Sequence, residues 1–301
     1  MKIKNKKLTI FMYHQIIDNP SQFCIDFHLN VKPTIFKKQI DWICNKYTII
    51  NPNTLVNSDL LPDNAALITF DDGFKGAFQN GLSYLESKSI PSLMFLNMGH
   101  IIEKTPLISS AAIYFSNHFN EYLLNNERNF FYLNVTPNRF INTQNILTDL
   151  EKKRILDYQG SLADIDLLTK WENSNYVYYG NHLYEHYNST ALTSNEFSNS
   201  YSINNQKLSK FKNFINFFSF PNGKPLTCFN DNYLIIIKNL NCKKVFYSSG
   251  SINENSHDYL LDRIDFTDFE HNIFKMNFRI FISKIKSKLL FSLFQKFRKL
   301  F

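Results

Sequence analysis

The chain has 301 residues, of which 44% are hydrophobic, 16% aromatic and 20% charged. A chain of this length and composition buries enough apolar surface to offset its conformational entropy, which excludes a disordered protein and a disulfide-stapled mini-protein. The formal net charge of +7 resides in one segment, because residues 279–301 carry seven Lys and Arg and no Asp or Glu. A duplex-binding domain would spread basic residues over its folded body, so we expect no nucleic-acid partner.

Neither the cysteines nor the first residues indicate export. The cysteines are Cys24, Cys44, Cys228 and Cys242. None lies in a Cys-x-x-Cys pair, and a chain of this size needs no disulfide framework, so we expect reduced thiols. The Lys-rich start resembles the basic region of a signal peptide, but His14 and Gln15 interrupt the apolar run that follows it, and there is no small-residue cleavage site. No uninterrupted apolar run reaches the roughly 18 residues of a membrane span. We expect a cytoplasmic protein.

Short apolar runs alternate with helical patterns in the first hundred residues. Residues 8–13 and 65–70 predict buried strands. Apolar residues at helical spacing predict a helix over 34–47, and residues 75–88 also suit a helix. Residues 91–98 predict a third strand. This alternation indicates βαβ units and a mainly parallel sheet or barrel.

The pattern loosens between residues 99 and 175. Helices are expected around 111–124 and 146–156, with Asn-rich joints between them, and we interpret 99–175 as a helical insertion. No internal repeat or low-complexity linker is present. The simplest division is a domain of residues 1–270 followed by a C-terminal helix over 271–301.

Regular alternation resumes after the insertion. Residues 176–179 predict a strand, and residues 193–196, Thr-Ser-Asn-Glu, have the form of a capping box that starts a helix. Strands are expected near 214–220 and 244–248. A helix that contains residues 234–240 separates them.

Two adjacent carboxylates follow the second strand. Asp71 and Asp72 come directly after an apolar run and precede Gly73. Consecutive strand residues point to opposite faces of a sheet, so both side chains reach one cavity only where the chain turns, which Gly73 permits. Burying two adjacent carboxylates without a cation is costly. The pattern indicates either a cation site or a solvated Asp-Asp-Gly turn.

Two histidines supply a second set of ligand groups. His182 and His186 follow the strand expected at 176–179, and their spacing lets both imidazoles face one metal ion. Together with one carboxylate they leave coordination positions open for water and substrate, as in a catalytic metal site. The alternative is a structural role for each histidine.

Two other hydrolase classes are alternative interpretations of these residues. Residues 182–186 also spell the His-x-x-Glu-His motif of inverted zinc peptidases. That motif needs a continuous helix, whereas Gly180 precedes the string and Asn188 follows it. A two-carboxylate glycosidase fits poorly, because adjacent Asp71 and Asp72 do not flank a sugar from separate positions. The catalytic metal site is favoured.

Two further segments end at the same edge of the expected sheet. Residues 217–220 lead into the Pro-Asn-Gly turn of residues 221–223, whose backbone N–H groups can face a developing oxyanion. His14 follows the first strand. Taken singly, an ordinary turn and a structural histidine are the usual interpretations of such features.

Together these segments resemble the polysaccharide deacetylase family, the NodB-homology or carbohydrate esterase family 4 enzymes. The matching strings are Phe11-Met12-Tyr13-His14, Thr69-Phe70-Asp71-Asp72-Gly73, Gly180-Asn181-His182 to His186, Phe218-Ser219-Phe220-Pro221-Asn222-Gly223 and Leu261-Asp262-Arg263-Ile264. The ordered set is far more specific than any single string. The resemblance implies hydrolysis of acetamide or ester groups on sugars.

The resemblance implies distinct roles for the ligand groups. Asp72, His182 and His186 would hold a divalent metal ion, usually Zn²⁺, and Asp71 would take a proton from metal-bound water. The chemistry agrees, because a bound metal ion lowers the pKa of water towards about 7 and polarises an acetyl carbonyl.

The resemblance also assigns the oxyanion and the leaving group. The backbone N–H of Asn222 would stabilise the tetrahedral oxyanion. The chain is similar to a circularly permuted branch that begins with a Tyr-His strand and takes its general acid from that strand. This makes His14 the expected proton donor to the leaving amine.

The sequence departs from the family pattern near these residues. The small hydroxyl residue usual after the first metal histidine is Leu183, and the Pro usual after the second is Tyr187. Asn222 stands where an aromatic residue is common. The Arg that often orients the catalytic base is missing beside Pro221, and we expect Arg263 to replace it. None of these departures removes a metal ligand.

These observations predict a deformed (β/α) barrel of the NodB type, with the site at the carboxyl ends of the strands. The expected reaction is metal-dependent removal of an N-acetyl or O-acetyl group from a sugar in a cell-surface glycan or its precursor. The alternative is a catalytically silent glycan-binding or complex-organising protein of the same fold. Retention of Asp71, Asp72, His182, His186 and His14 together favours the enzyme.

The basic C-terminal segment has a pattern of its own. Apolar residues recur at steps of three and four at Phe278, Ile282, Ile285, Leu289, Leu293, Phe297 and Leu300, with Lys284, Lys288, Gln295 and Lys299 mainly on another face. Such a helix can lie in the interface of an anionic membrane. Residues 278–301 therefore predict peripheral binding to the inner face of the membrane, and the alternative is a helix packed on the barrel with its lysines in water.

Overall fold

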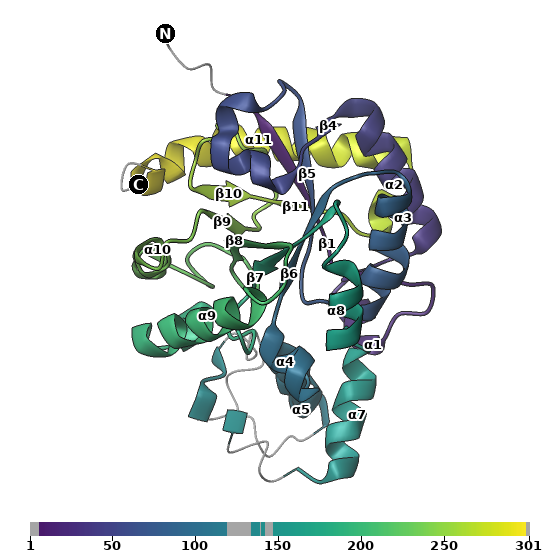
Figure 1. The fold of residues 1–301 in the computed structure, drawn as a ribbon, viewed down its shortest axis with the longest axis vertical. Helices are drawn as coiled ribbons and strands as arrows, with labels where there is room; N and C mark the ends of the chain where they lie inside the picture. Colours follow the sequence, from purple (N-terminus) through teal and green to yellow (C-terminus); the bar gives the residue numbers. More distant parts are fainter. Residues whose placement is uncertain (1–5, 119–133, 139, 142–146, 299–301) are drawn as a thin grey trace.

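The computed structural model describes residues 6–118, 134–138, 140–141 and 147–298. In this part of the chain, one sheet of nine parallel strands forms the centre of the protein (Figure 1). Eight strands follow one another in the order β10-β9-β8-β7-β6-β5-β1-β11. These are β1 (Leu8–Tyr13), β5 (Ala65–Phe70), β6 (Ser92–Leu96), β7 (Val177–Asn181), β8 (Phe214–Ser219), β9 (Lys244–Tyr247), β10 (Leu260–Asp262) and β11 (Ile264–Asp265). The ninth, β4 (Thr48–Ile49), pairs with the start of β5.

The two ends of this sheet meet in one segment of the chain. β10 pairs with β9 and β11 pairs with β1, and only Arg263 separates β10 from β11. The stretch from Leu260 to Asp265 therefore bridges the first and last strands and nearly closes the sheet into a barrel. The prediction of a deformed (β/α) barrel is confirmed.

Both faces of the strands are buried, which explains their continuous apolar sequences. Alternate residues such as Ile10, Leu67 and Phe95 form one buried cluster. Their neighbours, such as Phe11 and Ile68, belong to another cluster, which also includes residues of the surrounding helices. This alternation follows from the two-residue period of a strand and fills the barrel with side chains.

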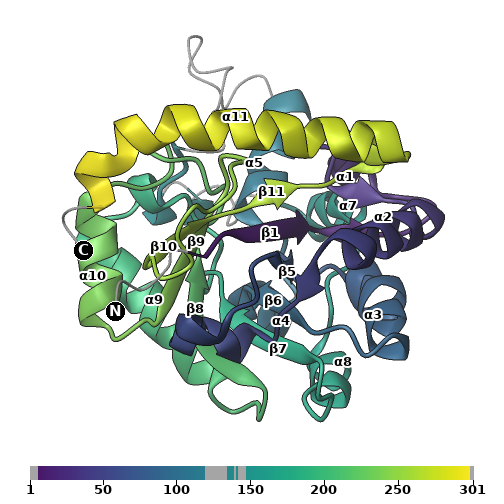
Figure 2. The same cartoon turned by 90° about the horizontal axis from the view of Figure 1, so that it is seen from above.

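Helices surround the barrel (Figures 1 and 2). They include α2 (Pro33–Lys46), α3 (Ser83–Ser87), α8 (Ile165–Trp171), α9 (Ser194–Leu208), α10 (Asp231–Asn239) and α11 (Ile273–Arg298). The helix predicted over 75–88 is a π-helix, η2 (Ala77–Leu82), that continues into α3. The predicted capping box is confirmed, because Thr193 Oγ1 accepts from Glu196 N and Glu196 Oε2 accepts from Thr193 N.

Smaller elements line the carboxyl ends of the strands or join the larger ones. They are β2 (Gln15–Ile16), which pairs with β3 (Asn30–Val31), together with α1 (Gln22–Asp26), η1 (Pro52–Leu60), η5 (Ser189–Ala191) and η6 (Asp268–Glu270). The four cysteines are unpaired.

The segment between β6 and β7 carries helices in its described parts. These are α4 (Met98–Glu103), α5 (Ile108–His118) and α7 (Asp149–Gln159), followed by α8. The helix expected at 111–124 begins three residues earlier, and its part beyond residue 118 lies outside the described residues. The helix expected at 146–156 is α7, shifted by three residues.

Parallel pairing places the carboxyl ends of the strands together. Tyr13 at the end of β1 pairs with Phe70 at the end of β5. The next residues, His14 and Asp71, therefore leave the sheet side by side, and Asp71 N donates to Tyr13 O at 3.0 Å. The predicted site residues that follow β5, β7 and β8 are brought to this same edge.

Candidate metal-binding and catalytic site

The chain turns abruptly where β5 ends. Asp72 has a φ of +68° and Gly73 a φ of +76°, so two successive residues adopt the left-handed region that non-glycine residues rarely visit. The turn lets the neighbouring side chains of Asp71 and Asp72 enter one cavity, where both are buried. A Cβ at residue 73 would lie 2.8 Å from Leu96 Cδ2, so a larger residue there would also have to displace the Leu96 side chain.

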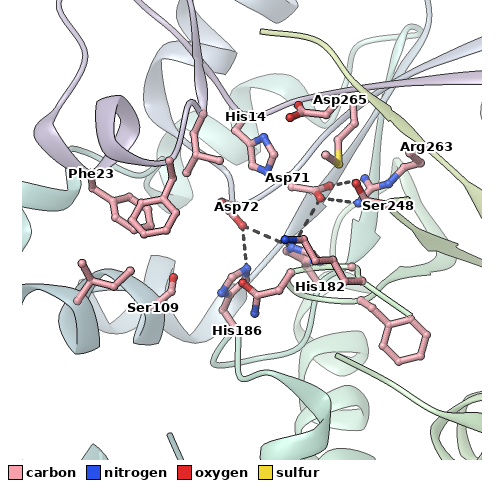
Figure 3. Close-up of a pocket in the computed structure, with 18 residues that line it drawn as sticks. His14, Phe23, Asp71, Asp72, Ser109, His182, His186, Ser248, Arg263 and Asp265 are labelled. Atoms are coloured by element: carbon pink, nitrogen blue, oxygen red, sulfur yellow. Dashed lines mark hydrogen bonds and ion pairs between the residues drawn. The ribbon is translucent and has the colours of Figure 1, made fainter. Parts of the chain in front are cut away.

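The two histidines lie in the turns that follow β7, and no helix runs through residues 182–186. Leu183 and His186 both have positive φ values, +63° and +58°. These turns bring His182 Nε2 to 3.4 Å and His186 Nε2 to 3.0 Å from Asp72 Oδ1. One ligand atom from each of the three residues lies within 4.8 Å of the others, and all three residues are buried (Figure 3).

Hydrogen bonding at His182 indicates which ring nitrogen is free. His182 Nδ1 lies 2.7 Å from Ser219 O, and because a carbonyl only accepts, Nδ1 carries the hydrogen. Nε2 then directs its lone pair towards Asp72. Asp72 Oδ1 is itself buried without a hydrogen-bond partner. Two lone pairs that face each other in a buried site fit a cation between them.

Asp72 is an anionic group despite its burial. Burial by itself raises the pKa of Asp72, but the adjacent imidazoles of His186 and His182 outweigh it and hold the pKa well below its usual range. The donor set of one carboxylate and two imidazoles is the one that Zn²⁺ and similar divalent metals accept. The residues present therefore fit a metal ion.

Asp71 has a different partner. Its carboxylate accepts two hydrogen bonds from Arg263, at 2.7 Å from Nη1 and 2.6 Å from Nη2. Burial raises the pKa of Asp71, but the Arg263 guanidinium, with smaller help from His182, lowers it below the ordinary value. Its nearer oxygen stands 3.8 Å from His182 Nε2, so this fixed carboxylate borders the three ligand groups.

Several contacts fix the Arg263 guanidinium. It is only 1% exposed, and its Nη2 also donates to Ser219 Oγ at 2.7 Å. The guanidinium carbon lies 5.3 Å from the centre of the Phe95 ring. Ser219 thus contacts both the ligand group and the Asp71–Arg263 pair, because its carbonyl fixes His182 and its hydroxyl fixes Arg263.

A cavity of about 270 Å³ opens above these groups. Its lining includes every residue that the sequence analysis proposed for the site: His14, Asp71, Asp72, His182, His186, Asn222 and Arg263. Apolar side chains form much of the remaining wall, among them Phe23 and Phe27 from the segment around α1, and Ile113 from α5. The segment between β6 and β7 therefore contributes directly to the cavity.

His14 lies across the cavity from the histidine ligands. Its half-buried ring points towards Asp71 and Asp72 (Figure 3). Asp265, which sequence reasoning missed, lines the same cavity. Burial raises the pKa of Asp265, and the charge of His14 partly offsets this. Asp265 stands two residues after Arg263 on an extended segment, and the two-residue period of a strand was the available signal for it.

The remaining site residues lie at the end of β8 and in the turn that follows it. Asn222 has a φ of +60° in the turn after β8, and Gly223 beside it has a φ of +58°. Both line the cavity. Ser219, the second residue that sequence reasoning missed, is the last residue of β8.

Glu185 does not take part in the site. Its carboxylate accepts from Ser200 Oγ at 2.5 Å and lines a separate cavity between α4 and α9. An inverted zinc peptidase needs this glutamate beside the metal and a helix through the motif. The geometry meets neither condition.

Comparisons with known proteins agree on the fold. A family model described as polysaccharide deacetylase matches residues 61–245. A Streptococcus pyogenes deacetylase, PplD, solved in complex with acetate, is 15% identical with a TM-score of 0.60, over 88% of this chain and 94% of that one. IcaB from Ammonifex degensii is also 15% identical, with a TM-score of 0.57 over 88% and 93%. A de-N-acetylase from Aggregatibacter actinomycetemcomitans is 15% identical, with a TM-score of 0.58 over 91% and 100%.

No functionally curated protein matches the sequence. The range matched by the family model includes both aspartates and both histidine ligands but ends before Arg263 and begins after His14. These two residues are joined to the rest of the site by the pairing of β1, β5 and β11.

Proposed function

The chain belongs to the polysaccharide deacetylase family, and from this premise we propose that it uses a divalent metal ion to remove acetyl groups from sugar nitrogen in a cell-surface glycan or its precursor. The observation that carries the proposal is the buried group of Asp72, His182 and His186 beside the Asp71–Arg263 pair. Hydrolysis of an acetamide needs an activated water, a polarised carbonyl and a proton for the departing nitrogen. The cavity offers a group for each.

Asp72, His182 and His186 would hold the metal ion. The facing lone pairs and the unpartnered Oδ1 of Asp72 support this assignment, and Zn²⁺ suits the donor set. A metal ion held there would be a Lewis acid, which would lower the pKa of water and polarise the acetyl carbonyl.

Asp71 acts as the general base. Its lowered pKa keeps it ionised at neutral pH, so it is ready to accept a proton from the attacking water. Two hydrogen bonds from Arg263 hold both carboxylate oxygens and prevent rotation about the carboxyl group. Arg263 is thus a positioning residue that aims the base.

His14 and Asn222, which line the cavity, supply the proton for the leaving group and a hydrogen bond to the oxyanion. His14 donates a proton to the sugar nitrogen as the bond to the acetyl carbon breaks, and Asp265 lies close enough to stabilise its protonated ring. The backbone N–H of Asn222 donates to the oxygen that becomes negative in the tetrahedral state.

The cavity volume limits what enters the site. About 270 Å³ is slightly less than the volume of typical ligand pockets, which span about 300–1,000 Å³. It accommodates one acetylated sugar, and neighbouring sugars would lie outside the rim.

The test is acetate release from N-acetylglucosamine oligomers, with an O-acetylated sugar compared in parallel. We expect the Zn²⁺-loaded protein to release acetate, chelator to abolish the release, and added Zn²⁺ to restore it. Release that is unchanged after chelation would overturn the metal-dependent mechanism. No release from any acetylated sugar by metal-loaded protein would favour the catalytically silent alternative.

A further inference from the structure

Over residues 273–288, whose side chains the structure describes, helix α11 packs against the barrel through one face. It lies alongside β1 and β11 (Figure 2), and its inward residues Met276, Ile280, Ser283 and Ser287 are buried. Polar contacts help to fix this face, because Lys286 Nζ donates to the carbonyl of Ser249 at 3.1 Å. Part of the inward face is therefore small and polar, although the helix as a whole is rich in Phe and Ile.

Four large apolar side chains of α11 point away from the barrel. Phe274 is 78% exposed, Phe278 50%, Phe281 57% and Ile285 40%. Steps of four, three and four residues keep these side chains within an arc of about 60° along roughly 16 Å of helix. We call these four residues the outer stripe. The rings of Phe274 and Phe278 stack, with planes 8° apart, and a continuous exposed stripe of this kind marks a surface that binds something apolar.

Lysines flank the outer stripe. Lys284 and Lys288 are exposed and Lys275 is half-buried, and by helical spacing they stand on both sides of the stripe. Helix α11 contains no Asp or Glu. A second copy of the chain would bring like charges together if it paired through this face. An anionic bilayer offers the opposite charge and an apolar layer directly below it.

We propose that the outer stripe of α11 binds the surface of an anionic lipid bilayer. The aromatic rings enter the boundary between headgroups and acyl chains, and the lysines contact lipid phosphates. The apolar face inferred from sequence shares Phe278 and Ile285 with this stripe, and Phe274 and Phe281 are added by the structure. Among the described residues, no helix is long and apolar enough to cross a membrane.

The location of α11 links this surface to the catalytic cavity. Its first turns, with Lys275 and Arg279, line a second cavity that shares Phe27 and Asp265 with the catalytic one. The first turns of α11 therefore lie near the catalytic cavity. Binding of this helix to a membrane would suit a glycan carried by a membrane lipid. This statement about the substrate rests on the proposed function, but the proposed binding of lipid by α11 does not.

The experiment is co-sedimentation of the full chain with vesicles of phosphatidylcholine mixed with phosphatidylglycerol, and with vesicles of phosphatidylcholine alone. A triple variant, Phe274→Gln with Phe278→Gln and Phe281→Gln, removes the stripe. A matched control replaces three apolar residues of comparable exposure on other elements. Its substitutions are Val56→Gln, Leu150→Gln and Ile235→Gln. Circular dichroism and acetate release from a soluble substrate check that both variants are folded.

We expect the wild-type chain and the matched control to bind anionic vesicles equally, and the stripe variant to bind at least about tenfold more weakly. Lys275→Gln with Lys284→Gln and Lys288→Gln should remove the preference for anionic vesicles. Equal binding by the stripe variant and the control, or no binding by the wild type, would overturn the proposal. A dimer that dissociates in the stripe variant, without vesicle binding, would identify a second copy as the occupant and also overturn it.

Discussion

Asp71 and Asp72 are neighbours in sequence but have different partners, so equal substitutions should have unequal effects. Asp71→Asn keeps the three ligand groups and removes the base, whereas Asp72→Asn removes a ligand oxygen. We expect Asp71→Asn to retain about one metal ion per chain and lose activity by roughly 10²–10⁴-fold. Asp72→Asn should lose both metal and activity. Elemental analysis and acetate release on the same samples measure this.

The control is Asp157→Asn, an exposed aspartate on α7, which should change neither quantity. Equal metal content in the Asp71→Asn and Asp72→Asn proteins would contradict the division of roles.

Arg263 should set the pH at which the base becomes active. The guanidinium lowers the pKa of Asp71 against the effect of burial. In Arg263→Met burial acts without that opposing charge, so Asp71 becomes protonated at a higher pH. The acid limb of kcat/KM should therefore move to higher pH, while metal content stays the same. Arg263→Lys keeps the charge without the paired hydrogen bonds, and its acid limb should move less.

A pH profile of kcat/KM for the three proteins makes the comparison. A lower activity with an unshifted acid limb in Arg263→Met would assign Arg263 a structural role only.

His14 should affect the departing amine without affecting the metal. His14→Ala removes the proposed donor, and hydrolysis should slow by roughly 10²–10⁴-fold. Metal content should remain that of the wild type, because His14 is not among the three ligand residues. A substrate whose leaving group needs no proton, such as an activated aryl ester, should lose much less. An equal loss with both substrates would argue against the role of general acid.

Sequence could identify the site residues but not their conformations. The Asp-Asp-Gly string indicates a turn, yet nothing in it requires Asp72 itself to adopt a positive φ. That conformation depends on neighbouring segments that hold the residue in place. The pairing of Asp71 with Arg263 joins residues 192 positions apart. The family resemblance led us to expect this pair, but no local pattern encodes its geometry.

At the scale of single elements, the start of α9 offers a direct test. Thr193 and Glu196 satisfy each other's backbone N–H groups in a capping box. Thr193→Ala should lower the free energy of unfolding by about 0.5–2 kcal/mol, and Thr193→Ser, which retains the hydroxyl, should lower it much less. Urea denaturation measures both. A serine variant as unstable as the alanine variant would mean that packing of the methyl group matters more than the cap.

Sequence predicted best the strands whose apolar runs contain no charged residues of the site. β1 and β5 have the predicted bounds, because their apolar runs are buried on both faces. β10 and β11 were missed. The segment they form carries Asp262, Arg263 and Asp265, and charged residues inside a strand break the apolar run by which a strand is recognised. Two of these three residues, Arg263 and Asp265, line the catalytic cavity, so residues of the site helped to obscure the strand pattern.

At the scale of the whole molecule, metal binding should stabilise the fold. The three ligand residues come from the turns after β5 and β7, so they form one site only in the folded chain. A metal ion at a hundredfold excess over its Kd should raise the free energy of unfolding by about 2.7 kcal/mol. Thermal unfolding with Zn²⁺ and with chelator measures the shift, and His182→Ala should show none. A similar shift in that variant would mean that the metal binds elsewhere.

The closure of the barrel through residues 260–265 also bears on the order of events during synthesis. Asp71 leaves the ribosome 192 residues before Arg263, which at about 5–20 residues per second is an interval of roughly 10–40 s. Throughout this time the nascent chain has the carboxylates of the site without the guanidinium that neutralises one of them, and β1 without its neighbour β11. The edge of β1 that pairs with β11 therefore stays unpaired until the last part of the chain has been made. The same six residues, 260–265, therefore complete both the catalytic site and the barrel.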